Sequence, residues 1–156
     1  MSQGPASDQP VELNEMPPEP TQAQGFVQAR AARSASLLED YVELIADLLA
    51  ALGEARATEI AKRMGVAIPT AIKNIGRLKR EGLVNSRPYR GIFLTAAGDE
   101  LAGRVKARHR LVIDLLLAVG VPAEAAEADA EGMEHHASIA TLEAFRKFIA
   151  TRKPMP

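Results

Sequence analysis

The sequence predicts a mainly α-helical protein: an N-terminal winged helix-turn-helix domain with a small β-hairpin, followed by an all-helical lobe. Apolar residues recur at spacings of three and four along most of the 156-residue chain, which is typical of amphipathic helices. Aromatic residues make up only 4% of the chain, so Leu, Ile, Val and Ala must build the core. The period changes after Gly82, where two short segments predict a β-hairpin.

The first 25 residues differ in composition from the rest of the chain. They hold four acids, no Lys or Arg, and five of the ten prolines. Such a segment buries too little apolar surface to offset the entropy lost on ordering. We therefore expect a disordered, acidic, proline-rich tail, and we place its end at residue 35 because helical periodicity begins at Ser36.

A DNA-binding type of domain is predicted for residues 36–95. The first helix should end at Gly53, a residue suited to the left-handed helix terminus. Two short helices follow at residues 58–64 and 69–81, joined by a tight turn that contains Gly65, which is the helix-turn-helix pattern. The segments 83–87 and 91–95 predict the two strands of the wing.

Residues 96–152 are predicted to form a helical lobe with helices at 96–119, 123–136 and 138–152. Thr95 and Ser138 are suited to cap the first and last of these. The lobe carries more apolar side chains than three helices readily bury, which predicts a homodimer. These side chains are Leu111, Val112, Leu115, Leu116, Val119, Leu142, Phe145 and Phe148.

Positive charge is concentrated in one part of the chain. Residues 56–90 hold nine bases and two acids, a net charge of +7, although the whole chain has a net charge of −1. A basic block in an otherwise neutral protein indicates a polyanion-binding surface. Thr70 and Asn74 are the candidates for base contacts, and Lys73 and Arg77 for phosphate contacts. Pro69 shares their exposed face, and Arg90 lies at the wing tip; a dimer of such domains would read palindromic double-stranded DNA.

Acids and histidines gather in residues 129–136. Glu131, Glu134 and His135 have the spacing i, i+3 and i+4, which places two carboxylates and one imidazole on the same helix face. Metal sites in helical proteins use this spacing. His109, Asp40 and Glu43 could complete such a site. Spacing alone does not join these segments, because a single helical histidine is more often a buried structural residue and the two acids are more often solvent-facing.

Four runs of the chain resemble the manganese transport regulator (MntR) group of the diphtheria toxin repressor family. They are residues 38–45, 89–95, 108–109 and 129–136, and the resemblance covers about residues 36–150. It implies a Mn²⁺-responsive repressor that controls manganese homeostasis. It also implies a binuclear site, with two Mn²⁺ ions per subunit, on Asp40, Glu43, His109, Glu131, Glu134 and His135. Iron-responsive relatives carry Met and Cys where this chain has Asp40 and Glu131, and that difference favours manganese.

Composition excludes several other classes of protein. The chain has no cysteine, so disulfide scaffolds, thiolate zinc sites and thiol catalysis are ruled out. No apolar run approaches the ~18 residues of a membrane span, and we expect a cytoplasmic protein without a small-molecule substrate. Two alternatives remain: a winged-helix regulator that senses Fe²⁺ or an organic ligand, and a di-metal carboxylate enzyme. The enzyme would leave the basic block unexplained, so we expect no enzymatic activity.

Overall fold

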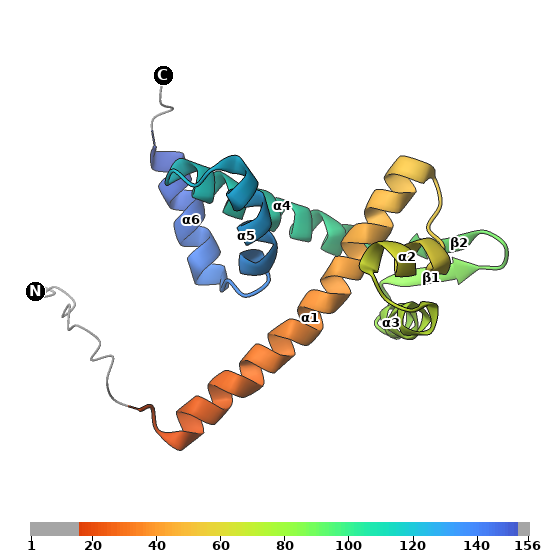
Figure 1. The fold of residues 1–156 in the computed structure, drawn as a ribbon, viewed down its shortest axis with the longest axis horizontal. Helices are drawn as coiled ribbons and strands as arrows, with labels where there is room; N and C mark the ends of the chain where they lie inside the picture. The colour runs from red at the N-terminus through yellow and green to blue at the C-terminus, as the bar shows by residue number, and fades with distance from the viewer. Residues whose placement is uncertain (1–15, 153–156) are drawn as a thin grey trace, which may run out of the picture.

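The computed structural model describes residues 16–152. In chain order the elements are α1 (Glu19–Leu52), α2 (Ala57–Met64), α3 (Ile68–Arg80), β1 (Val84–Arg87), β2 (Gly91–Leu94), α4 (Ala96–Ala118), α5 (Ala123–Glu134) and α6 (Ile139–Thr151). Figure 1 shows one lobe built from α2, α3 and the hairpin and another from α5 and α6, with α1 and α4 crossing between them. The predicted mainly helical fold class is confirmed.

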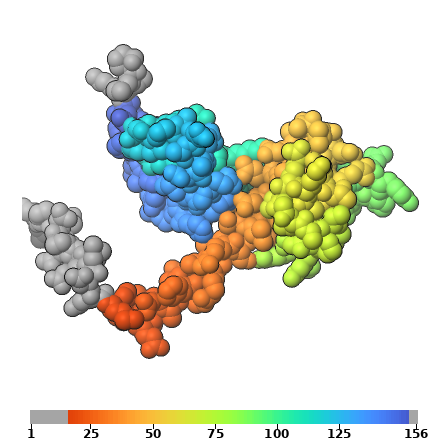
Figure 2. All heavy atoms as spheres, viewed as in Figure 1, coloured from red at the N-terminus to blue at the C-terminus, as the bar shows by residue number. Residues whose placement is uncertain are grey.

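The start of α1 differs from the prediction. The helix begins at Glu19, not at Ser36, so the predicted disordered tail is wrong for residues 19–35; its residues 1–15 lie outside the described part of the chain. The proline content indicated disorder, but Pro20 lies in the first helical turn, where a proline ring is tolerated. The residues that follow are mostly Ala, Gln and Arg, which are good helix formers. Figure 2 shows this first half of α1 projecting away from both lobes.

The winged helix-turn-helix lobe packs around the second half of α1. Tyr41, Val42 and Ile45 of α1 are fully buried and belong to one apolar cluster with residues of α2, α3 and both strands. The left-handed C-caps Gly53 and Gly65 end α1 and α2 as predicted. Because α1 also packs against α4, the same helix contacts both lobes.

The hairpin is held against the start of α4. Strands β1 and β2 are antiparallel, with Val84 opposite Leu94 and Arg87 opposite Gly91. Thr95 caps α4 as predicted, since its side chain accepts a hydrogen bond from the Gly98 backbone N–H. A Cβ atom on Gly98 would lie 2.1 Å from the carbonyl oxygen of Leu83. Only glycine therefore allows α4 to approach the hairpin this closely.

The helical lobe has a small core of its own. Val112, Ile113 and Leu116 of α4 pack against Ala126 and Ala130 of α5. Two members of the predicted dimer face, Val112 and Leu116, are thus buried inside the lobe, where they face α5. Among the exposed large apolar side chains of this lobe are Val119 and Phe148 from the predicted set, together with Leu117, Met133 and Ile139. Ser138 caps α6 as predicted.

Within residues 16–152, no helix combines the length and the apolarity needed to cross a membrane.

Candidate metal centre and nucleic-acid interface

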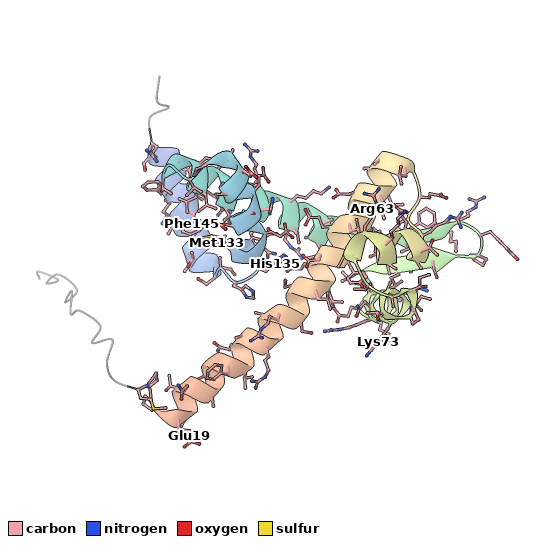
Figure 3. All side chains as sticks on the ribbon, viewed as in Figure 1. Glu19, Arg63, Lys73, Met133, His135 and Phe145 are labelled. Atoms are coloured by element: carbon pink, nitrogen blue, oxygen red, sulfur yellow. The ribbon has the colours of Figure 1, made fainter. Side chains whose placement is uncertain are left out.

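Carboxylates and imidazoles converge where α1, α4 and α5 meet. Over the described residues, two groups have ligand atoms within 4.8 Å of one another: Asp40, Glu131 and His135, and His109, Glu131 and Glu134. Glu131 belongs to both groups. Figure 3 shows His135 at the end of α5, close to α1. The structure therefore brings together five of the six ligands that the family resemblance implies.

Glu134 lies at the centre of this cluster. Its Oε1 is 3.4 Å from His109 Nδ1 and 3.4 Å from His135 Nε2. His135 Nε2 is also 3.0 Å from Oδ1 of Asp40, and His109 Nδ1 is 3.6 Å from Oε2 of Glu131. The two histidines thus approach the same carboxylate oxygen of Glu134.

The donor atoms of this cluster fit a cation. Asp40 Oδ1, His109 Nδ1, both carboxylate oxygens of Glu134 and His135 Nε2 are buried and make no hydrogen bond within residues 16–152. Buried polar atoms normally have partners, and a lack of them calls for an explanation such as a bound ion. Carboxylate oxygens with imidazole nitrogens form a hard donor set, which suits Mn²⁺ or Fe²⁺.

Burial perturbs the acids of the cluster. It raises the pKa of Glu134 to about 7, against the opposing effect of His135, His109 and Arg108. Burial also raises the pKa of Asp40 and of Glu43, and in both the negative charge of Glu131 adds to the shift. These carboxylates destabilise one another in the charged state, and a divalent cation would relieve that repulsion.

Glu43, the sixth predicted ligand, lies beside the cluster and belongs to neither group. Together with Asp40, Asp47 and Glu131 it lines a cavity of about 290 Å³ that α2 borders on its other side. Glu127, which the sequence analysis did not single out, has its Oε2 3.7 Å from His109 Nε2. Glu127 lies four residues before Glu131 on α5, and this spacing could have indicated that both side chains share one helix face.

Sequence reasoning also missed an ion pair directly behind the cluster. Glu39 of α1 accepts a hydrogen bond from Nη2 of Arg108 on α4, and its Oε2 lies 2.8 Å from Nδ1 of His135. Both side chains of the ion pair are mostly buried. Glu39 and Arg108 lie within two of the runs that carried the family resemblance, but their pairing spans 69 residues and no spacing rule predicts it.

The predicted DNA-contacting residues fall into two sets. Pro69, Thr70 and Lys73 of α3 are exposed, and Figure 3 shows Lys73 on the side of α3 that faces away from the other helices. Asn74 and Arg77, in contrast, are turned toward α1. Asn74 donates a hydrogen bond to the Tyr41 hydroxyl (3.1 Å), and Arg77 donates one to the Ser34 hydroxyl (2.9 Å). The predicted role of Asn74 as a free base-reading side chain is therefore not supported.

The wing presents a polar and aromatic tip. Arg90 is exposed, as predicted, and its neighbour Tyr89 is 96% exposed with a left-handed φ of 63°. Arg56 donates a hydrogen bond to the Tyr89 carbonyl at 3.3 Å, which holds the tip. A cavity of about 420 Å³ separates the wing from α3, and its rim carries Lys79 and Arg87.

A winged helix-turn-helix whose first helix also contributes to a carboxylate–imidazole cluster defines a class: DNA-binding regulators that respond to a metal ion. Comparison with known proteins gives the same answer. Residues 35–92 match the iron dependent repressor N-terminal DNA binding domain. Residues 95–156 match the iron dependent repressor metal binding and dimerisation domain.

Relatives agree with both matches. The chain is 50% identical over 125 residues to the transcriptional regulator MntR of Escherichia coli O6:H1, covering 80% of this chain and 81% of the relative. It is 32% identical over 119 residues to the HTH-type transcriptional regulator MntR of Lysinibacillus sphaericus, covering 76% and 86%.

Solved structures show the same fold. The manganese regulator SloR superimposes with a TM-score of 0.63 at 29% identity, and ScaR with bound Cd²⁺ with 0.65 at 27%. Each comparison covers 76% of this chain but only 56% of the solved chain, so this chain spans just over half the length of those two proteins.

The chain belongs to the diphtheria toxin repressor family, and within it to the MntR group of metal-dependent transcriptional regulators. It carries the family's DNA-binding domain and its metal-binding and dimerisation domain, and the family is one of regulators and not of enzymes.

Proposed function

We propose that this protein is a Mn²⁺-responsive repressor that binds palindromic operator DNA as a homodimer, with two metal ions per subunit. The predicted control of manganese homeostasis is part of this proposal. It is supported by the similarity to the transcriptional regulator MntR and to the manganese regulator SloR, and by the oxygen-rich donor set of the cluster.

One observation carries the binuclear part of the proposal. The two ligand groups overlap in Glu131, and Glu134 is equidistant from the two histidines. Asp40 and His135 would hold one ion and His109 the other, with Glu131 and Glu134 between them. Glu43 would join from the rim of the adjoining cavity.

Coupling to DNA follows from where the ligands lie. Asp40 belongs to α1, whose next turns form the core of the DNA-binding lobe, whereas the other residues of the two groups lie on α4 and at α5. A bound cation would supply positive charge between Asp40 of α1 and the acids of α5. Asp40 would then hold α1 against α5, and α3 would move with α1 because the two helices share one apolar core. A geometry that favours DNA must by linkage also favour the metal, typically by 1–3 kcal/mol.

On the DNA side, Thr70 would contact base edges in the major groove and Lys73 would contact a phosphate. Asn74 and Arg77 would hold α3 at a constant distance from α1, through Tyr41 and Ser34. Ile72 is 55% exposed on the same helix, and an apolar side chain there suits a thymine methyl group. Arg90 would contact the phosphate backbone from the wing.

The metal count tests this proposal. Mn²⁺ binding should be measured by isothermal titration and by electron paramagnetic resonance on the full chain. We expect two ions per chain. Glu131→Gln should weaken both, because Glu131 belongs to both groups, whereas Glu143→Gln, the same change at an exposed position of α6, should weaken neither. A single ion per chain would contradict the binuclear site.

A further inference from the structure

We propose that Glu39 is a positioning residue for the metal centre: it fixes the tautomer and the ring orientation of His135, and Arg108 holds Glu39 in place. This inference rests on the proposed function. It assigns a role to two residues that belong to neither ligand group.

The geometry around His135 distinguishes its two ring nitrogens. Nδ1 lies 2.8 Å from Oε2 of Glu39, while Nε2 lies 3.0 Å from Oδ1 of Asp40 and 3.4 Å from Oε1 of Glu134. The ring is 96% buried, since its side chain is 4% exposed. It is therefore clamped between an acid behind it and the acids of the cluster in front.

The acid behind the ring determines where the proton lies. A carboxylate only accepts hydrogen bonds, so the 2.8 Å contact requires a proton on Nδ1. The guanidinium of Arg108 also approaches Nδ1, at 3.4 Å, and could donate only if Nδ1 were bare. That alternative would place a bare nitrogen 2.8 Å from a carboxylate oxygen. On the other side of the ring, Nε2 and Asp40 Oδ1 lie 3.0 Å apart but form no hydrogen bond, so the hydrogen bond to Glu39 assigns the proton to Nδ1.

Nδ1–H leaves the lone pair on Nε2, which is the nitrogen that faces Asp40 and Glu134. A neutral imidazole ligates through its unprotonated nitrogen. Carboxylates that hold the other nitrogen of a ligating histidine orient the ring and make it a stronger donor. Nε2 has no hydrogen-bond partner among residues 16–152, as expected of an atom kept for a ligand.

Arg108 holds the Glu39 side chain in place. Its Nη2 donates to Glu39, and its Nε lies 3.9 Å from Oε2 of Glu134. One arginine on α4 thus faces the positioning acid on α1 and the central acid on α5. Removing Glu39 would free Arg108 as well as His135.

Two measurements on the full chain test this role. The first needs neither metal nor DNA: imidazole ¹⁵N shifts of the metal-free protein, which distinguish a protonated from an unprotonated ring nitrogen. The chain has only three histidines, so His135 is readily assigned. We expect the Nδ1–H form in the unmodified chain and a shift toward the Nε2–H form in Glu39→Ala.

The second measurement is Mn²⁺ affinity. Glu39→Ala should lower it by about 10–100-fold. Glu39→Gln should recover much of the loss, because its amide oxygen still accepts from Nδ1–H. Glu100→Ala is the matched control: Glu100 also pairs with an arginine, Arg104, at 3.1 Å, but on the exposed surface of α4, and its removal should leave the affinity unchanged.

The outcomes separate this role from a merely structural one. A lower melting temperature of Glu39→Ala with unchanged Mn²⁺ affinity would overturn the proposal, as would an Nε2–H tautomer of His135 in the unmodified chain. If Glu39→Ala does not fold, the tautomer of the unmodified chain and the affinity of Glu39→Gln still decide. Failure of the unmodified chain to bind Mn²⁺ would overturn the proposed function instead, and with it the metal-related role of Glu39.

Discussion

Glu134→Gln should stabilise the metal-free protein and abolish its response to Mn²⁺. The side chain of Glu134 is fully buried and its carboxylate oxygens make no hydrogen bond within the described residues. Its pKa is about 7 in the folded chain, whereas the ordinary value is 4.5. An ionised carboxylate in this buried site lowers the free energy of unfolding, and the neutral amide of Gln avoids that cost.

The sign of the pH dependence follows from the raised pKa. Below about pH 4.5 the acid is protonated in both the folded and the unfolded states, and the full stability is present. As the pH rises toward 7, the unfolded state ionises first and the free energy of unfolding falls. A shift of this size corresponds to roughly 3 kcal/mol once the pH lies above 7. Glu134→Gln removes that loss, so its advantage over the unmodified chain should grow from near zero at about pH 4 to a few kcal/mol at about pH 8.

Urea unfolding followed by circular dichroism, with a chelator present and at fixed protein concentration, measures this difference. Glu143→Gln, the same change on the exposed surface of α6, should show no pH-dependent gain. Added Mn²⁺ should reverse the order, because binding at 100 times Kd stabilises the unmodified chain by about 2.7 kcal/mol. A variant less stable than the unmodified chain at about pH 8, or a difference independent of pH, would refute the reasoning.

Three other substitutions test the fold, the DNA surface and the metal preference. Gly98→Ala should lower the free energy of unfolding by about 1–3 kcal/mol, because its Cβ meets a backbone oxygen. Gly103→Ala, in open space on the same helix, should raise the free energy of unfolding by about 0.5–1 kcal/mol. Urea titrations compare the two variants, and equal effects would contradict the packing at the hairpin. Lys73→Ala should weaken DNA binding and reduce its salt dependence by about one phosphate contact per protomer, as measured by fluorescence anisotropy. The Mn²⁺ affinity should be unchanged. A loss of metal binding would show that the DNA-binding surface and the metal centre are not separate. The double substitution Asp40→Met with Glu131→Cys should lower Mn²⁺-activated DNA binding at least about tenfold, because softer donors disfavour Mn²⁺. In an anaerobic titration the variant should retain a response to Fe²⁺. An unchanged Mn²⁺ response would show that neither residue is a ligand.

Most elements of the fold were predictable from periodicity and from terminating residues. Helices α2 to α6 lie within two residues of their predicted bounds, because caps such as Thr95 and Ser138 and left-handed glycines such as Gly65 mark helix ends through local physics. The beginning of α1 was not predictable in this way. Composition near the N-terminus indicates disorder, whereas the helix propensity of residues 21–35 favours a helix, and the structure follows the propensity.

The site was predictable only in part, for a different reason. The i, i+3, i+4 spacing of Glu131, Glu134 and His135 revealed one helix face, but its junction with Asp40 and His109 depended on the family resemblance. Side-chain partners across elements leave no periodic signal. For that reason the analysis of spacing missed Glu39 behind His135, and Asn74 was expected to face DNA although it bonds to α1.

The central claim is that Mn²⁺ controls sequence-specific DNA binding by this chain. The most direct test is to incubate the full chain with a random pool of double-stranded DNA, with and without Mn²⁺ at one fixed salt concentration, and to sequence the retained DNA. We predict that a palindromic sequence is enriched with Mn²⁺ and not with a chelator, and that Glu134→Gln enriches no sequence under either condition. Enrichment of the same sequence without Mn²⁺, to the same extent, would contradict the account.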